Sequence, residues 1–477
     1  MRLRELTLTG LKWAFGARLF KQISQFIITI ILARLLSPSD FGIVGMVTVF
    51  TGFATIFSDM GVNLALVQKK HVKEEHLSSA FWVTVASGVL ISIVFVFLSP
   101  AIASFYNNQS LKPVIQVFSL NFIFASFSVV QQSVLQKSMS FKKIALSESV
   151  AVFISGVIAI IMAFYGYGYW SLVFQTILFT ILNVVILFLL SPWSPKFIFS
   201  WNSFKEIIYF SANVTGFNVI NYFSRNSDYL LIGKFLGPVS LGYYTLAYKL
   251  MMIPLQNISS IFGKVVFPAF SKMQEDLPRL RVAYLKVIKA ISLVTFPLML
   301  FIFGISKEFI IVIYGVKWER VIPIITILSI CGLFQSISTT AGNIFFSQGA
   351  CAKQLKLSII GTIFVLLAIF IGIRWDIYGV ALFYTLEQII WSLIVQYLAN
   401  SLIKLEMKVF FKELYNSVVI SLIIVSFLLL LRLFNLNVFS FFIVASIAAL
   451  CVYFVLLLVF NEIGYRRGRM YIKIIDV

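Results

Sequence analysis

Basic side chains inside apolar segments are the residues of this sequence best suited to chemistry. They are Arg18, Lys21, Arg225 and Lys249. A charge within a membrane span costs roughly 2.5 to 3.5 kcal/mol on insertion scales, so each of these residues is expected to have a function or a partner. Ammonium and guanidinium groups form charge-assisted hydrogen bonds with phosphate oxygens. We therefore predict that the four cations line a hydrated cavity between the two halves of the chain and bind an anionic head group.

Structural explanations compete with this prediction for two of the four cations. Arg18 and Arg225 each lie about seven residues, or ~10 Å, from the end of a predicted helix, so their side chains could reach the membrane interface. Arg225 could instead form a structural ion pair with Asp228, three residues further along the same helix. The sequence leaves both alternatives open.

Two acidic residues within the apolar segments are candidates for ion coupling. They are Asp228 and Glu387. Glu387 could also be a hydrogen-bonded or protonated interior carboxylate, because no repeat-matched partner for it is evident in the sequence. The assignment to ion coupling is therefore the weaker of the two interpretations for Glu387.

Cysteine and histidine patterns give no sign of a metal or cofactor. Cys331, Cys351 and Cys451 are scattered without ligand-like spacing, so neither a metal site nor a disulfide framework is expected. His71 and His76 share one charged loop and are expected to be solvated. No cofactor is predicted.

Membrane helices are the elements that must position these residues. Hydrophobic residues make up 60% of the chain and charged residues 12%, whereas soluble domains have about 25% charged residues. Apolar runs of roughly twenty residues recur, each long enough to cross a ~30 Å hydrocarbon core as a helix. The fold class is therefore an all-α polytopic membrane protein with about fourteen transmembrane helices. The predicted spans are 11–35, 41–66, 80–99, 113–136, 144–165, 169–190, 206–232, 240–263, 283–303, 321–346, 357–373, 377–400, 414–431 and 438–460.

The formal charge of +20 could indicate a nucleic-acid partner, so the placement of the basic residues decides its meaning. When the spans are threaded from a cytoplasmic N-terminus, most lysines and arginines fall in loops on the cytoplasmic side. This bias is typical of membrane topology, and it also places the basic loops against anionic lipid. Membrane lipids are therefore predicted partners, and nucleic acid is not.

A repeated motif indicates that the chain is duplicated. LSPSDFG at 36–42 and LGPVSLG at 236–242 place Leu, Pro and Gly in register, two hundred residues apart. Each half then has six helices, and an even number makes the halves parallel repeats. We predict a six-helix lobe at 1–200, a second at 201–400, and two additional helices with a basic cytoplasmic tail at 401–477.

Three segments of the sequence resemble the bacterial polysaccharide exporters, a family of lipid-linked oligosaccharide flippases. The segments are ARLLSPSDFG at 33–42, DYLLIGKFLGPVSLGYYTLAYKL at 228–250 and FPAFSKMQEDLPRLRVAY at 267–284. The exporters include O-antigen, colanic-acid and teichuronic-acid flippases, and they share a superfamily with the lipid II flippase and the multidrug extruders. The resemblance covers nearly the whole chain.

This resemblance implies an activity and a location. A V-shaped pair of six-helix bundles would alternate access and move an undecaprenyl-diphosphate-linked oligosaccharide from the inner to the outer leaflet, for lipopolysaccharide or exopolysaccharide biosynthesis. The location would be the bacterial cytoplasmic membrane, with both termini cytoplasmic. Other polysaccharide assembly proteins are candidate partners.

Two other functions are weighed against the flippase. A multidrug cation antiporter of the same superfamily would depend on intramembrane acids, whereas the first helix here carries only bases within its span. A membrane-embedded polysaccharide polymerase or ligase would be expected to carry a large outer loop with clustered polar residues, and the predicted outward loops are short. We therefore predict a transporter and not an enzyme.

Overall fold

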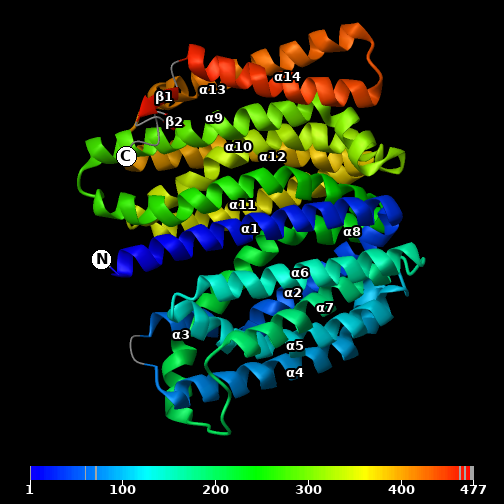
Figure 1. Ribbon diagram of the computed structural model, residues 1–477, viewed down its shortest axis with the longest axis vertical. Helices are drawn as coiled ribbons and strands as arrows, with labels where there is room; N and C mark the ends of the chain where they lie inside the picture. Colours follow the sequence, from blue (N-terminus) through cyan, green and yellow to red (C-terminus); the bar gives the residue numbers. More distant parts are fainter. Residues whose placement is uncertain (1, 60, 70–71, 461–462, 467–468, 473–477) are drawn as a thin grey trace. The chain divides into compact units, whose positions relative to one another are not determined.

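The computed structural model describes residues 2–59, 61–69, 72–460, 463–466 and 469–472 (Figure 1). Side chains are described for fewer residues than the backbone. Among the residues above, those without a described side chain are 2–15, 17–18, 57–59, 64, 68, 204, 207–221, 223–225, 257–265, 268, 463–466 and 469–472. The chain is almost entirely helical, as predicted, because buried backbone groups in a membrane must be hydrogen-bonded within their own segment. A short hairpin near the end of the chain is the departure from the all-α prediction.

The elements follow the apolar runs of the sequence. The helices are α1 (Arg2–Leu35), α2 (Pro38–Asp59), α3 (Val62–Gln68), α4 (Glu74–Phe105), α5 (Leu111–Lys137), α6 (Phe141–Phe164), α7 (Trp170–Leu190), α8 (Trp201–Lys272), α9 (Leu277–Phe309), α10 (Val321–Ser347), α11 (Cys351–Gly372), α12 (Asp376–Leu402), α13 (Met407–Leu431) and α14 (Val438–Val459). Short π or 3-10 turns occur at η1 (Ile310–Tyr314), η2 (Val316–Trp318), η3 (Ile373–Trp375) and η4 (Arg432–Phe434). The strands β1 (Ile463–Arg466) and β2 (Arg469–Ile472) pair antiparallel.

Ten helical segments within the described residues are long and apolar enough to cross a membrane. The protein is therefore a multi-pass membrane protein. The number of fourteen spans stays a prediction.

Two glycines with positive φ mark where predicted spans and observed helices differ. The predicted span 41–66 was wrong as one helix, since Gly61 (φ 68) separates α2 from α3. By contrast, the long α8 includes two predicted spans and bends between them at Gly237 (φ 79, ψ −178). Glycine has no Cβ and tolerates both conformations at little cost.

The chain divides into two compact units, Met1–Gly242 and Tyr243–Val477, and each is described by itself. The division falls within α8, after the kink at Gly237. The domain boundaries drawn from the sequence repeat, at residues 200 and 400, stay predictions.

In the first unit, α4 packs along α5, and α6 packs against both α1 and α7 (Figure 1). Ile28 of α1 fills the space beside Gly156 of α6. A Cβ added at Gly156 would lie 2.1 Å from Ile28 Cδ1. The Lys21 ammonium of α1 meets the Glu148 carboxylate of α6 at 2.7 Å. Ile28 follows Lys21 along α1, and its partner Gly156 follows Glu148 along α6. The two helices therefore run parallel. This agrees with their predicted places as the first and fifth spans.

In the second unit, α9 is the central helix and contacts α10 and α13. The last two helices, predicted to be appended to the repeat, pack against it (Figure 1). Leu428 of α13 occupies the space beside Gly304 of α9, and Ile305 belongs to the same buried cluster as Phe441 of α14. The Arg432 guanidinium also donates to Gly304 O at 3.0 Å and to the Glu308 carboxylate at 3.2 Å.

Candidate functional site

The two copies of the repeated motif touch each other. A Cβ at Gly42 would lie 1.7 Å from the carbonyl oxygen of Pro238, and a Cβ at Gly242 would lie 1.9 Å from the carbonyl oxygen of Pro38. Each motif therefore places its glycine against the proline carbonyl of the other copy. This reciprocal arrangement is what a two-fold relation between the copies requires. The duplication inferred from the sequence thus has a structural counterpart.

The first part of α8 lies along α2 beyond this contact. Tyr222 of α8 donates its hydroxyl to Val49 O of α2 at 2.7 Å, and the same ring covers Gly52. Near the kink, Gly233 of α8 lies against Met46 of α2. Close packing through glycine thus fixes this part of α8, the helix that carries Arg225 and Asp228.

Lys21 is the predicted binding cation that the structure describes most completely. Its Nζ donates to Glu148 Oε2 at 2.7 Å, and the two side chains are 32% and 31% exposed. The ammonium also lies 5.9 Å from the ring centre of Phe179 in α7. Lys21 is therefore reachable by a ligand but already has a counter-ion. The sequence carries no signal that pairs residues 127 positions apart.

The other residues predicted for unit 1 are only partly described. The side chains of Arg18 and Arg225 lie outside the described residues, so the cavity assignment and the Arg225–Asp228 pair stay predictions. Asp228 itself is buried, and its Oδ1 accepts the backbone N–H of Tyr229 at 2.9 Å. Arg18 precedes Lys21 by three residues in α1, which places the two on neighbouring turns of one helix.

Lys249 and Glu387 belong to the second unit. Lys249 lies in α8 beyond the kink and is exposed. Glu387 of α12 is half-buried; its Oε2 accepts from Gln388 Nε2 at 2.8 Å, while its buried Oε1 has no hydrogen-bond partner among the described residues. The hydrogen bond fits the interior-carboxylate interpretation, and ion coupling by Asp228 and Glu387 stays a prediction.

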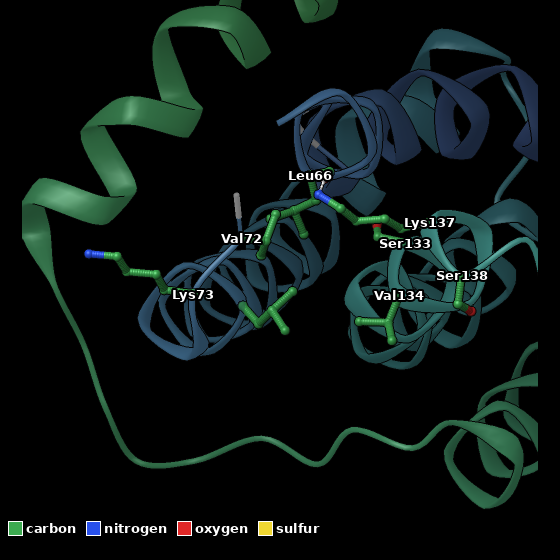
Figure 2. A pocket seen from close by; sticks show the side chains of 8 residues that line it. Leu66, Val72, Lys73, Ser133, Val134, Lys137 and Ser138 are labelled. Atoms are coloured by element: carbon green, nitrogen blue, oxygen red, sulfur yellow. Dashed lines mark hydrogen bonds between the residues drawn. The ribbon is translucent and has the colours of Figure 1, made fainter. Parts of the chain in front are cut away.

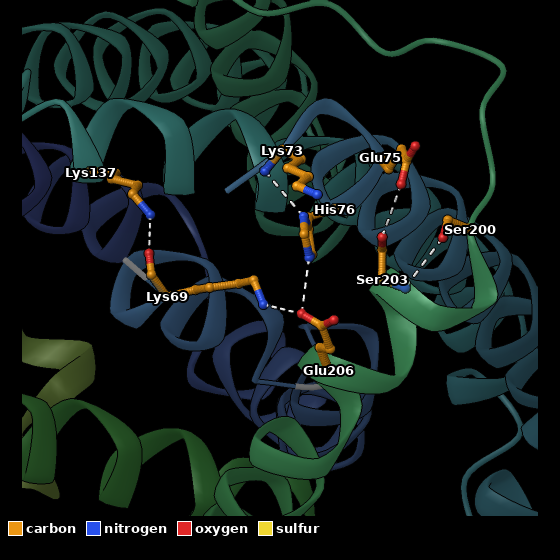
Figure 3. Close-up of polar contacts among 8 residues, drawn as sticks. All are labelled: Lys69, Lys73, Glu75, His76, Lys137, Ser200, Ser203 and Glu206. Atoms are coloured by element: carbon orange, nitrogen blue, oxygen red, sulfur yellow. Dashed lines mark hydrogen bonds and ion pairs between the residues drawn. The ribbon is translucent and has the colours of Figure 1, made fainter. Parts of the chain in front are cut away.

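A polar cluster ties the end of α3 to the starts of α4 and α8 (Figure 3). His76 Nδ1 accepts the backbone N–H of Lys73 at 3.1 Å, so the ring proton sits on Nε2, which faces Glu206 Oε2 at 3.2 Å. Lys69 also donates to Glu206. The expectation that His76 is solvated was wrong, because its hydrogen bonds at both nitrogens allow its burial to 4% exposure. His71 lies outside the described residues.

A pocket of about 620 Å³ lies beside this cluster, between α3, α4 and α5 (Figure 2). Leu66, Val72, Leu77 and Val134 form its apolar wall, with Lys73, Ser133, Lys137 and Ser138 as polar lining. Lys137 donates to Leu66 O at 3.2 Å and to Lys69 O, and Lys73 extends away from the pocket (Figure 2). Neither ammonium therefore points freely into the pocket, and Lys21 is the better anion-binding candidate.

We expect Lys137→Met to destabilise the protein by about 1 to 2 kcal/mol, since it removes the donor to two carbonyls at the C-terminal end of α3. Thermal unfolding of the purified protein would measure the loss as a lower Tm. Lys112→Met, at the opposite end of α5 and exposed, is the matched control. Equal Tm values for both variants would contradict a capping role for Lys137.

Characterised relatives are similar over most of the chain. The chain is 28% identical to the lipopolysaccharide biosynthesis protein WzxC of Escherichia coli (strain K12), covering 82% of this chain and 80% of that protein. It is 26% identical to the teichuronic acid biosynthesis protein TuaB of Bacillus subtilis (strain 168), covering 87% and 86%. The succinoglycan biosynthesis transport protein ExoT of Rhizobium meliloti (strain 1021) is 27% identical, covering 66% and 64%.

Solved structures share the fold at lower identity. The lipid II flippase MurJ in an inward closed conformation superposes with a TM-score of 0.75 at 19% identity, covering 94% of this chain and 98% of that chain. An inward-facing multidrug resistance transporter of the MATE family superposes with a TM-score of 0.63 at 14% identity, covering 80% and 94%. These likenesses show that the fold is that of the MurJ and MATE transporters.

The sequence profile of one family, described as polysaccharide biosynthesis protein, matches residues 31–323. The matched region includes both copies of the repeated motif, at 36–42 and 236–242, and the whole of α8. It is more than half of the 477 residues, so the chain belongs to the polysaccharide biosynthesis protein family.

Proposed function

We propose that this protein flips an undecaprenyl-diphosphate-linked oligosaccharide from the cytoplasmic to the outer leaflet, for synthesis of a cell-surface polysaccharide. The observation that carries the proposal is Lys21, a cation within the membrane helix α1 whose side chain is 32% exposed. The names of its relatives, which include a transport protein for succinoglycan biosynthesis, support the same activity. The fold shared with MurJ supplies a scaffold on which a lipid flippase is known.

Binding of the diphosphate is the step to which the predicted cations contribute. We assign Arg18, Lys21 and Arg225 to this role in the first unit and Lys249 in the second. Hydrogen bonds between ionised groups are about twice as strong as neutral ones, and they strengthen where water is scarce. The substrate then crosses as the helix bundles alternate access, and Asp228 and Glu387 stay candidates for ion coupling.

The chain is assigned to the bacterial cytoplasmic membrane with both termini and the α8–α9 turn in the cytoplasm. Single-cysteine labelling in spheroplasts, with Cys331, Cys351 and Cys451 replaced, tests this topology. We expect Gln274→Cys to react only after permeabilisation and Glu319→Cys, just before α10, to react in intact spheroplasts. The reverse pattern would overturn the threading from positive charge.

Deleting the gene in its own host tests the function. We expect one surface polysaccharide to disappear while its lipid-linked repeat unit accumulates inside the cell. Unchanged polysaccharide with raised sensitivity to cationic dyes would favour the multidrug antiporter instead. Single repeat units that reach the surface but are not polymerised would favour the polymerase.

A further inference from the structure

The ion pair between Lys21 and Glu148 is held by a single hydrogen bond. Lys21 Nζ donates to Glu148 Oε2 at 2.7 Å, and Glu148 is the one hydrogen-bond acceptor of Lys21 among the described side chains. An ammonium has three N–H donors and a carboxylate has two acceptor oxygens. Most of the hydrogen-bonding capacity of both groups is therefore left for a ligand or for water.

Partial exposure makes this pair accessible to a ligand. The Lys21 and Glu148 side chains are 32% and 31% exposed, and the Phe179 ring lies 5.9 Å from the ammonium. The pair between Arg432 and Glu308 differs, because Glu308 is only 10% exposed and Arg432 also bonds Gly304 O. Arg432 itself is 42% exposed, so the two pairs differ in their acids: the Glu308 carboxylate is enclosed, whereas the Glu148 carboxylate can be reached by a ligand.

Rigid packing nearby fixes the position of the pair between Lys21 and Glu148. Ile28 lies two turns along α1 from Lys21 and fills the space beside Gly156, about two turns along α6 from Glu148. The two helices therefore hold the ammonium and carboxylate in register without further bonds to them. Displacing the carboxylate would therefore break its bond to Lys21 and none of these packing contacts.

We propose that Glu148 is an internal stand-in for the substrate phosphate. It neutralises Lys21 in the empty carrier, where a lone ammonium would be costly, and gives up Lys21 when the diphosphate arrives. Carboxylate and phosphate oxygens accept the same charge-assisted hydrogen bond. This inference rests on the proposed function and adds that Glu148 competes with the substrate, which weakens binding and speeds release.

If Glu148 competes with the substrate for Lys21, removing its charge should strengthen substrate binding. Glu148→Gln keeps the size of the side chain but removes its charge, so the substrate no longer has to displace an anion. We expect its Kd for undecaprenyl diphosphate to fall about twofold to fivefold, the effect of losing a part-exposed ion pair. Glu148→Asp, which retains the charge but shortens the reach, should give an intermediate Kd. A carboxylate with a merely structural role would weaken binding when it is removed.

The experiment measures binding of undecaprenyl diphosphate to the full-length protein in nanodiscs, with undecaprenol as the uncharged probe. Lys21→Gln should raise the Kd for the diphosphate, and none of the variants should change binding of undecaprenol. Glu206→Gln, which removes the acid of the Lys69 pair, is the matched control and should leave the Kd unchanged.

The possible results distinguish a failure of this inference from a failure of the proposed function. If wild-type protein binds the diphosphate more tightly than undecaprenol but Glu148→Gln and Glu148→Asp bind equally or more weakly, Glu148 is structural and the inference fails. If wild-type protein shows no preference for the diphosphate, the proposed function itself is overturned. Tighter binding in Glu148→Gln together with slower net flipping would support both.

Discussion

Gly242→Ala and Gly42→Ala are each expected to abolish the folded protein and, with it, polysaccharide export. The added Cβ would lie 1.9 Å from Pro38 O in one variant and 1.7 Å from Pro238 O in the other. Both partners are backbone atoms, so a side-chain rotation cannot relieve the overlap. The cost should exceed the ~1 to 3 kcal/mol typical of overpacking by a side chain, a large part of a total stability of about 5 to 15 kcal/mol.

Gly16→Ala is the matched control, because the same substitution in α1 meets nothing within 4 Å. Alanine is favoured over glycine within a helix by about 1 kcal/mol, so this variant should fold at least as well as wild type. Fluorescence-detected gel filtration of tagged protein would report the folded yield of all three. Wild-type yield and Tm for Gly242→Ala would contradict the close approach of the two motifs.

Removing the charge of Lys21 is expected to have the second large effect. Lys21→Ala should reduce flipping about tenfold or more, since a hydrogen bond between charged groups contributes about 1.5 to 3 kcal/mol. Arg18→Ala and Arg225→Ala are expected to act in the same direction while leaving membrane insertion intact. Cell-surface polysaccharide, measured at equal protein level, reports the loss.

The Glu148 carboxylate must be included in this test, because Lys21→Ala leaves it without its partner. The double variant Lys21→Ala with Glu148→Gln removes both charges and should restore stability but not flipping. Lys21→Arg retains the cation and should keep substantial activity. Recovery of flipping in the neutral double variant would mean that the pair is structural and that Lys21 does not bind substrate.

The membrane fold could be predicted because hydrophobic length alone dictates it. Apolar runs gave the helices, and the two copies of the Leu-Pro-Gly motif revealed the duplication that the reciprocal contacts of Gly42 and Gly242 now show in space. The break at Gly61 was missed, since glycine is common within membrane helices and its φ depends on the packing around it. Helix boundaries therefore depend on tertiary contacts that the sequence does not display.

The candidate site was predicted less completely than the fold. Lys21 was recognised because a charge within an apolar run is conspicuous, but its pairing with Glu148 depends on α1 and α6 packing side by side. The burial of His76 likewise depends on Glu206, which lies 130 residues further along the chain. Charged residues reveal where chemistry is possible, whereas their partners follow from the packing of helices.

Flipping in proteoliposomes tests the central claim most directly. A fluorescent undecaprenyl-diphosphate oligosaccharide is incorporated with purified protein, and a membrane-impermeant quencher is then added outside. We expect wild-type protein to expose the inner-leaflet fluorophore to the quencher over time, while Lys21→Ala and protein-free liposomes leave it protected. Equal protection in all three samples, or equal flipping of a fluorescent phospholipid by the wild type, would contradict the claim that this protein is a flippase for diphosphate-linked oligosaccharides.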